Sequence, residues 1–112
     1  NEMIDDLFRE VERKLMDFTK TAAYNDYLQA CRARLIAQNL LEDATITVRK
    51  ADVEVVMTLF KADQVTVIGA ETVHIGGLIC DQKSRGIEAD LSLDYRLKQQ
   101  MQWFYNHSQL II

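Results

Sequence analysis

The sequence predicts an α+β fold, in which a small mixed sheet of about four strands has helices packed against it and is preceded by an N-terminal amphipathic helix. Segments with apolar residues at helical spacing lie at both ends of the chain, and short segments of alternating apolar and polar residues lie between them. Proline is absent. With 112 residues, 48% of them hydrophobic and 27% charged, the chain has the size and composition of a globular unit with one core.

The first predicted helix spans residues 1–20 and carries a narrow apolar stripe. The stripe residues follow the 4-3-4-3 spacing of a coiled-coil seam and are Ile4, Phe8, Val11, Leu15 and Phe18. Two interpretations fit so short a repeat: the helix lies on its own domain, or the stripe faces a partner helix. Because the pattern is already running at Asn1, we expect the chain to be part of a longer protein.

A break at Thr19–Ala23 separates this helix from a second one. The apolar face of the second helix is predicted to consist of Tyr24, Tyr27, Leu28, Cys31, Leu35 and Ile36. A half-buried strand follows, because apolar and polar residues alternate over residues 44–49, with Ala44, Ile46 and Val48 on the apolar side.

A third helix is predicted to begin at or near Asp52, where a carboxylate suits the free amides and the dipole of a helix start. Its expected buried face consists of Val53, Val56, Met57 and Phe60. The next strand is predicted over Val65–Ile68 and ends at Gly69.

A β-hairpin and a helix complete the predicted fold. Gly76 and Gly77 open a strand over Leu78–Asp81, the polar turn Gln82–Gly86 follows, and apolar residues alternate again over the returning strand at 87–91. In the last helix, Ser92 is the expected N-cap, Asp94 lies in the first turn, and the core face consists of Leu93, Leu97, Met101 and Phe104. Trp103 falls off that face, where it either anchors an interface or covers a neighbouring loop.

Charge and composition exclude several classes of function. The net charge is -4 and acidic and basic residues are interleaved, so the basic surface that binds nucleic acid is not expected. The apolar runs are too short for direct membrane insertion. Cys31 and Cys80 lie in apolar patterns and are expected to be small core residues, which indicates the cytoplasm as the compartment.

The residues do not predict a catalytic, cofactor-binding or metal site. His74 and His107 lack metal-ligand spacing, and neither a nucleophile elbow nor a phosphate-binding loop is present. The alternative function is a small cytosolic ligand-binding or enzymatic α+β domain, with its site near His74, Gly76 and Gly77. A further alternative is an adaptor that self-associates through its first helix.

Several segments together resemble the E subunit of the V-type and A-type ATPases, over residues 17–112. They are Tyr24-Asn25-Asp26-Tyr27-Leu28, the strand Thr45–Arg49, Asp52, Gly76-Gly77-Leu78-Ile79 and Arg85-Gly86-Ile87, followed by Asp90, Ser92, Arg96 and Leu97. The sequence departs from the family pattern at Leu93, where an aromatic residue is common, in the segment Lys98–Gln102, and in the aromatic tail Trp103-Phe104-Tyr105. These departures affect the detailed partner surface.

The resemblance implies a structural, non-catalytic subunit of the peripheral stalk of a rotary ATPase. Residues 1–20 would then be the end of the stalk helix and residues 21–112 the globular head. The implied partners are a second peripheral-stalk subunit, called G, H or F in different organisms, and the B subunit at the top of the catalytic ring. Holding the ring still would couple ATP hydrolysis or synthesis to proton or sodium transport. The candidate partner-binding residues are Ile4, Phe8, Val11, Leu15, Phe18 and Trp103.

Overall fold

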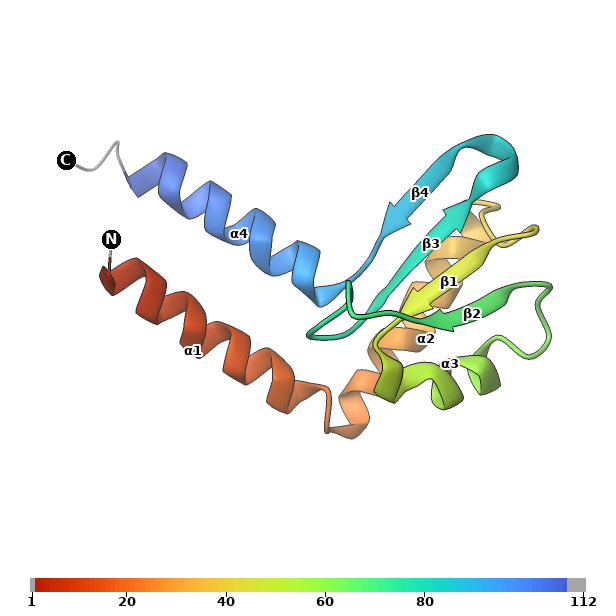
Figure 1. The fold of residues 1–112 in the computed structure, drawn as a ribbon, viewed down its shortest axis with the longest axis horizontal. Helices are drawn as coiled ribbons and strands as arrows, with labels where there is room; N and C mark the ends of the chain where they lie inside the picture. The colour runs from red at the N-terminus through yellow and green to blue at the C-terminus, as the bar shows by residue number, and fades with distance from the viewer. Residues whose placement is uncertain (1, 109–112) are drawn as a thin grey trace.

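A four-stranded sheet with a two-helix arm extending from one end forms the molecule, which a computed structural model describes over residues 2–108 (Figure 1). The principal extents are 51 × 30 × 22 Å, so the molecule is long relative to its width. The α+β prediction is confirmed, with a mixed sheet and helices packed against it. Residues 1 and 109–112, which the sequence analysis placed in the stalk helix and the head, lie outside the described residues.

The sheet has the strand order β2-β1-β3-β4. Strands β1 (Thr45–Val48) and β2 (Thr66–Gly69) pair in parallel, whereas β3 (Leu78–Gln82) pairs antiparallel with both β1 and β4 (Ile87–Asp90). The predicted hairpin is thus confirmed as β3–β4. Its turn contains the short 3₁₀ helix η2 (Lys83–Arg85).

The parallel pair requires a crossover, because two parallel strands cannot be joined by a tight turn. This crossover consists of the 3₁₀ helix η1 (Lys50–Asp52) and the short helix α3 (Val53–Leu59). Asp52 precedes α3 as predicted, but its side chain makes no capping hydrogen bond. Its carboxylate bonds to other side chains instead, as described below.

Helices α2 (Ala22–Ala37) and α3 cover the same face of the sheet, and the core lies between these two layers. Burial alternates along β1 and β3, as predicted for half-buried strands. The fully covered residues of this core include Leu28, Leu35, Ile46, Val48, Val56, Phe60 and Leu78. Two predicted core residues are instead exposed, Ile36 on α2 and Met57 on α3 (55% exposed). Each directly follows a fully buried residue, Leu35 or Val56, and so lies about 100° around its helix from that residue, at the edge of the buried face.

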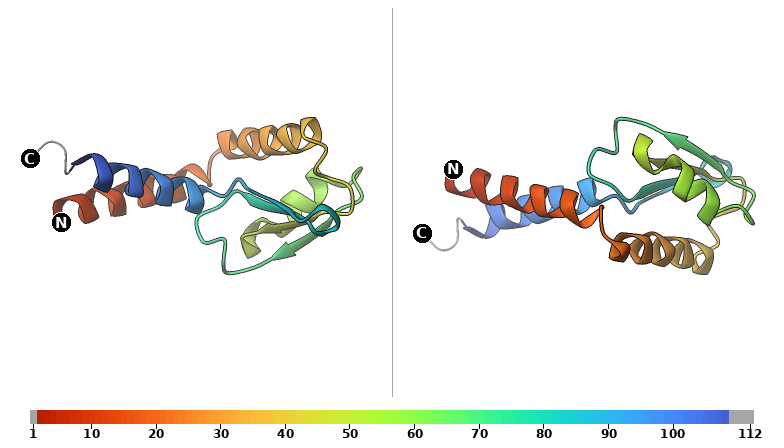
Figure 2. Two further views of the ribbon diagram at one scale, coloured as in Figure 1. Left: turned by 90° about the horizontal axis from the view of Figure 1, so that it is seen from above. Right: turned by 90° about the horizontal axis from the view of Figure 1, so that it is seen from below.

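The arm consists of α1 (Glu2–Phe18) and α4 (Leu93–Ser108). The two helices run in opposite directions and point away from the sheet, so that the start of α1 and the end of α4 lie at the same far end (Figures 1 and 2). The last helix therefore leaves the head and packs along the first one. The division of the chain near residue 20 stays a prediction.

Gly77 is required by a close backbone approach between the loop before β3 and the start of α4. Its φ is +81°, and a Cβ atom would lie 2.6 Å from the Leu91 carbonyl oxygen. Gly86 has a similar φ of +63°, but a Cβ atom there would meet nothing within 4 Å. These two glycines therefore separate the cost of backbone conformation from the cost of a clash.

We predict that Gly77→Ala destabilises the fold more than Gly86→Ala does. The left-handed conformation alone costs an alanine about 1–2 kcal/mol, and at Gly77 the clash with Leu91 adds to it. Urea denaturation of the two variants measures both costs. Equal losses of free energy of unfolding would contradict the close approach at Gly77.

Candidate interaction surface

The two arm helices are joined by an aromatic contact and a polar one. Phe8 of α1 packs edge-on against Phe104 of α4, with ring centroids 5.8 Å apart and planes at 81°. Phe8 is the residue of α1 that is fully buried. Near the far end of the arm, the Tyr105 hydroxyl donates a hydrogen bond to the Asp5 carboxylate. The arm is thus an antiparallel helix pair held within one chain.

The candidate partner-binding residues predicted from the sequence have different surroundings. Phe8 is buried beneath α4, whereas Ile4, Val11, Leu15 and Phe18 are half-buried. Leu15 and Phe18 also pack against the core of the head. Because α4 covers part of the stripe, the stripe contacts its own chain. The rest of the stripe stays accessible at the surface of the arm.

The open part of the stripe forms a groove between α1 and α4, which we call the arm groove. It has a volume of about 730 Å³ and is lined by Phe8, Val11, Leu15, Arg96, Leu97, Gln99 and Gln100. A smaller hollow lined by Gln99, Gln100 and Trp103 adjoins it on α4. Apolar side chains from both helices thus line a surface on the arm.

Trp103 lies exposed on this arm, with 56% of its surface accessible. Its ring stacks on the His107 ring at 4.0 Å between centroids, and the His107 Nδ1 atom lies 2.7 Å from the Trp103 carbonyl oxygen. The stacking fixes the indole against the helix rather than over a loop. Met3 and Leu7 of α1 are further large apolar side chains with exposed surface on the arm.

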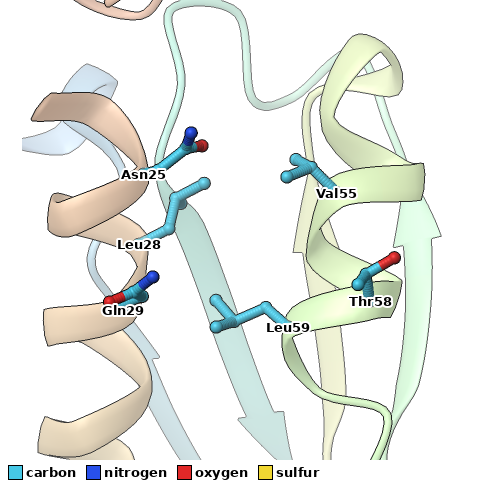
Figure 3. A pocket seen from close by; sticks show the side chains of 6 residues that line it. All are labelled: Asn25, Leu28, Gln29, Val55, Thr58 and Leu59. Atoms are coloured by element: carbon cyan, nitrogen blue, oxygen red, sulfur yellow. The ribbon is translucent and has the colours of Figure 1, made fainter. Parts of the chain in front are cut away.

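A second hollow, the head pocket, lies between α2 and α3. Figure 3 shows Asn25 and Leu28 of α2 facing Val55 and Leu59 of α3 across the gap, with the sheet behind them. The pocket has a volume of about 270 Å³ and is lined by Asn25, Leu28, Gln29, Val55, Thr58 and Leu59. Val55 is exposed there, and Ile36 of α2 and Met57 of α3 are also exposed.

The arm meets the head at a buried polar junction centred on Tyr24. The Tyr24 hydroxyl donates to the Asp52 carboxylate at 2.6 Å and accepts from the Gly77 N–H at 2.7 Å. Asp52 is only 4% exposed, and Arg49 Nη2 donates to its second oxygen at 2.8 Å. Arg49 Nη1 reaches the Thr19 hydroxyl at 3.1 Å and the Ile75 carbonyl at 3.2 Å. The junction therefore joins the end of α1, α2, η1 and the loop before β3.

Asp94 binds the same loop from the first turn of α4. Its carboxylate accepts hydrogen bonds from the backbone N–H groups of His74, Ile75 and Gly76, at 2.9–3.4 Å. Ser92 caps α4 as predicted, because its hydroxyl accepts from the Tyr95 N–H at 3.1 Å. The loop is thereby tied both to α2 in the head and to α4 in the arm.

The residues around His74, the alternative site, make contacts that connect parts of the fold. The His74 side chain is 68% exposed, with Nε2 3.8 Å from a Glu12 carboxylate oxygen on α1. Gly76 and Gly77 allow the loop to approach Tyr24 and Leu91, since a Cβ atom on Gly76 would lie 2.7 Å from the Tyr24 hydroxyl oxygen. The amides of 74–77 are occupied by Asp94 and Tyr24. This region therefore joins elements of the fold.

Burial governs the ionisable groups of the core. Cys31 and Cys80 are buried as predicted, and burial raises the pKa of both thiols. Burial, together with the hydrogen bond to Asp52, also raises the pKa of Tyr24. The Tyr24 junction and the Asp94 contacts were not predicted from the sequence. Asp52 and Asp94 were both interpreted from their positions at the start of a helix, and a pairing over 28 residues leaves no local pattern.

Within residues 2–108, no group of three or more His, Cys, Asp or Glu side chains could hold a metal ion. No helix in the same range combines the length and the apolar character needed to cross a membrane.

The comparison with known families decides between the interpretations. A sequence model of the ATP synthase (E/31 kDa) subunit family matches residues 1–106, which is nearly the whole chain. The chain belongs to the ATP synthase E subunit family. The resemblance stated from the sequence is thereby confirmed. A search of curated proteins found no match.

Membership of the E subunit family changes how the arm is interpreted. The E subunit is one subunit of an ATPase complex that contains other subunits, so a surface that contacts another subunit is expected on it. The match covers α1 and most of α4, so the arm lies within the matched residues.

We predict that Tyr24→Phe lowers the free energy of unfolding of this chain by about 1–3 kcal/mol, because Asp52 and the Gly77 N–H each lose a partner in a buried position. Tyr95→Phe is the matched control, since Tyr95 is exposed, and should change stability by no more than about 0.5 kcal/mol. Urea denaturation measures both. A Tyr24→Phe variant as stable as the control would show that the junction adds nothing to stability.

Proposed function

We propose that this chain is a structural, non-catalytic part of the peripheral stalk, or stator, of a rotary V/A-type ATPase. The family match is the observation that carries this proposal. In this role the chain holds the catalytic ring still while the central rotor turns. ATP hydrolysis or synthesis is then coupled to proton or sodium transport. The proposed location is the cytoplasmic side of the membrane, to which the chain is bound through the complex.

The proposed first partner is the second stalk subunit, of the G, H or F type, bound along the arm. The arm groove supports this, because it combines half-buried Val11 and Leu15 of α1 with Leu97 of α4, which are apolar side chains of the kind that contact an amphipathic helix. Exposed Trp103 beside the groove has the size and chemistry of an interface anchor. A third helix laid between α1 and α4 would complete a small bundle.

The proposed second partner is the B subunit of the catalytic ring, bound by the head. The exposed apolar residues of α2 and α3 support a contact on this side of the head. They include Ile36 of α2 and Val55 of α3, and Val55 lies at the rim of the head pocket (Figure 3). Met57 lies two positions after Val55 and therefore faces a different side of α3. Isolated exposed apolar residues are common, whereas exposed apolar residues on two adjacent helices favour a contact surface.

A stator must transmit force between its two ends, and the junction at Tyr24 supports this requirement. Hydrogen bonds from Arg49, Tyr24 and Asp94 connect the loop before β3 to both helices of the arm and to the head. Because most of these groups are buried or half-buried, rotation of the arm relative to the head would break several hydrogen bonds at once.

We expect Val11→Asp to weaken binding to the second stalk subunit at least about tenfold, because a carboxylate in the arm groove loses its hydration when a helix covers it. Ile4→Asp should act in the same direction and less strongly, since Ile4 lies near the end of the arm. The chain and the candidate partner are co-expressed, and the complex is quantified by size exclusion.

Lys14→Asp is the control, because Lys14 is exposed on the same helix and its replacement changes the charge more than Val11→Asp does. It should leave the complex intact, and circular dichroism should show folded heads for all three variants. Undiminished co-purification of Val11→Asp would contradict the arm groove as the binding surface. A wild-type chain that stays alone with every stalk and ring subunit would contradict the stator function.

A further inference from the structure

A third hollow, which we call the arginine pocket, lies where α2 approaches the start of α4. It has a volume of about 400 Å³, within the range of pockets that bind small ligands. Its walls are mainly polar and aromatic side chains from the two helices: Tyr27, Cys31, Arg34, Tyr95, Arg96 and Gln99. This composition differs from that of the head pocket, which is lined largely by aliphatic and amide groups.

Arg34 and Arg96 stand apart from the other arginines of the chain. Among the described residues, neither side chain makes an ion pair or a hydrogen bond. The remaining arginine side chains all have polar partners, and these are Arg9, Arg13, Arg32, Arg49 and Arg85. In a chain with 17 acidic and 13 basic residues, two unpaired guanidinium groups on one pocket are unexpected.

The side chains that line the pocket carry two positive charges, on Arg34 and Arg96, and one negative charge, on Asp90, so a net positive charge remains. Burial raises the pKa of Tyr27 to about 12 and also raises the pKa of the Cys31 thiol, so both are neutral at physiological pH. The positive charges of Arg34 and Arg96 act against burial and favour a lower pKa at both Tyr27 and Cys31. Both charges therefore act on the same part of the pocket. The acidic residue among the lining side chains is Asp90, whose Oδ1 already accepts hydrogen bonds from the Ser92 N–H and hydroxyl.

We propose that the arginine pocket binds an oxyanion, a carboxylate or a phosphate group held by the guanidinium groups of Arg34 and Arg96. Guanidinium forks match both anions in geometry and charge. The exposed Tyr95 hydroxyl and the Gln99 amide supply further donors at the rim.

Two sources can supply such an anion, an acidic side chain of a neighbouring protein or free phosphate. Arg96 and Gln99 line both the arginine pocket and the arm groove, so a partner in the groove would present side chains at the pocket rim. The anion site goes beyond the proposed stator function. Because anion binding is tested on the chain alone, a failure to bind anions would leave the stator proposal unaffected.

The test is a titration of the isotope-labelled chain with inorganic phosphate, and separately with succinate, followed by the NMR signals of the backbone and of the arginine Nε–H groups. Sodium chloride keeps the ionic strength constant, because added salt alone would screen the charges. We expect saturable shifts centred on residues 27–34 and 90–99. Arg34→Gln with Arg96→Gln should weaken the affinity at least about tenfold, since the charge-assisted bonds are lost.

The control pair is Arg9→Gln with Arg13→Gln, which removes two exposed arginines from α1 and should leave the affinity unchanged. Both double variants should keep the wild-type spectrum of the head, since all four side chains are exposed. Saturable binding of phosphate but not succinate would support free phosphate as the ligand, and binding of succinate but not phosphate would support an acidic side chain. Saturable binding of both would support the oxyanion site without preference for either source. Shifts that never saturate, or an unchanged affinity in the Arg34/Arg96 variant, would overturn the proposal.

Discussion

The arrangement of the whole molecule depends on the buried carboxylate of Asp52. A charge this far from water is tolerated only when it is paired and hydrogen-bonded. Arg49 supplies the opposite charge at 2.8 Å and Tyr24 supplies a hydroxyl at 2.6 Å. Because these partners come from the end of β1 and from α2, satisfying one carboxylate fixes the position of the long second helix on the sheet.

The loop before β3 carries this constraint into the arm. Its backbone is bound by Tyr24 and Arg49 from the head and by Asp94 from α4. Gly77 allows the loop to pass within contact of Leu91, just before α4 begins. The same contacts that order the head therefore fix the direction of α4. The packing of Phe8 against Phe104 then holds α1 alongside α4.

Local patterns were enough to predict the helices, the strands and the hairpin. Alternation at Ile46 and Val48 identified β1, and helical spacing identified α2, because each pattern is set by neighbours along the chain. The same patterns assigned Ile36 and Met57 to the core, although both side chains are exposed. Helical spacing does not show where the edge of a buried face lies, because that edge is set by contacts with strands distant in the sequence.

The candidate site was predicted less completely, for a related reason. The stripe from Ile4 to Phe18 was correctly found as apolar, but its spacing could not show that α4 covers Phe8. The roles of Asp52 and Asp94 depend on partners 28 and 20 positions away along the chain, whereas acids before helices suggest caps first. Strand order likewise depends on long-range pairing, which alternation does not encode.

The most direct test of this account is whether the arm and the head form one rigid body in solution. Residual dipolar couplings of backbone amides report the orientation of each element relative to a common frame. The account predicts that couplings from α1 and α4 and those from the sheet fit a single alignment tensor with the orientations shown in Figure 1. Two different tensors, one for the arm and one for the head, would show that the junction at Tyr24 does not hold them together.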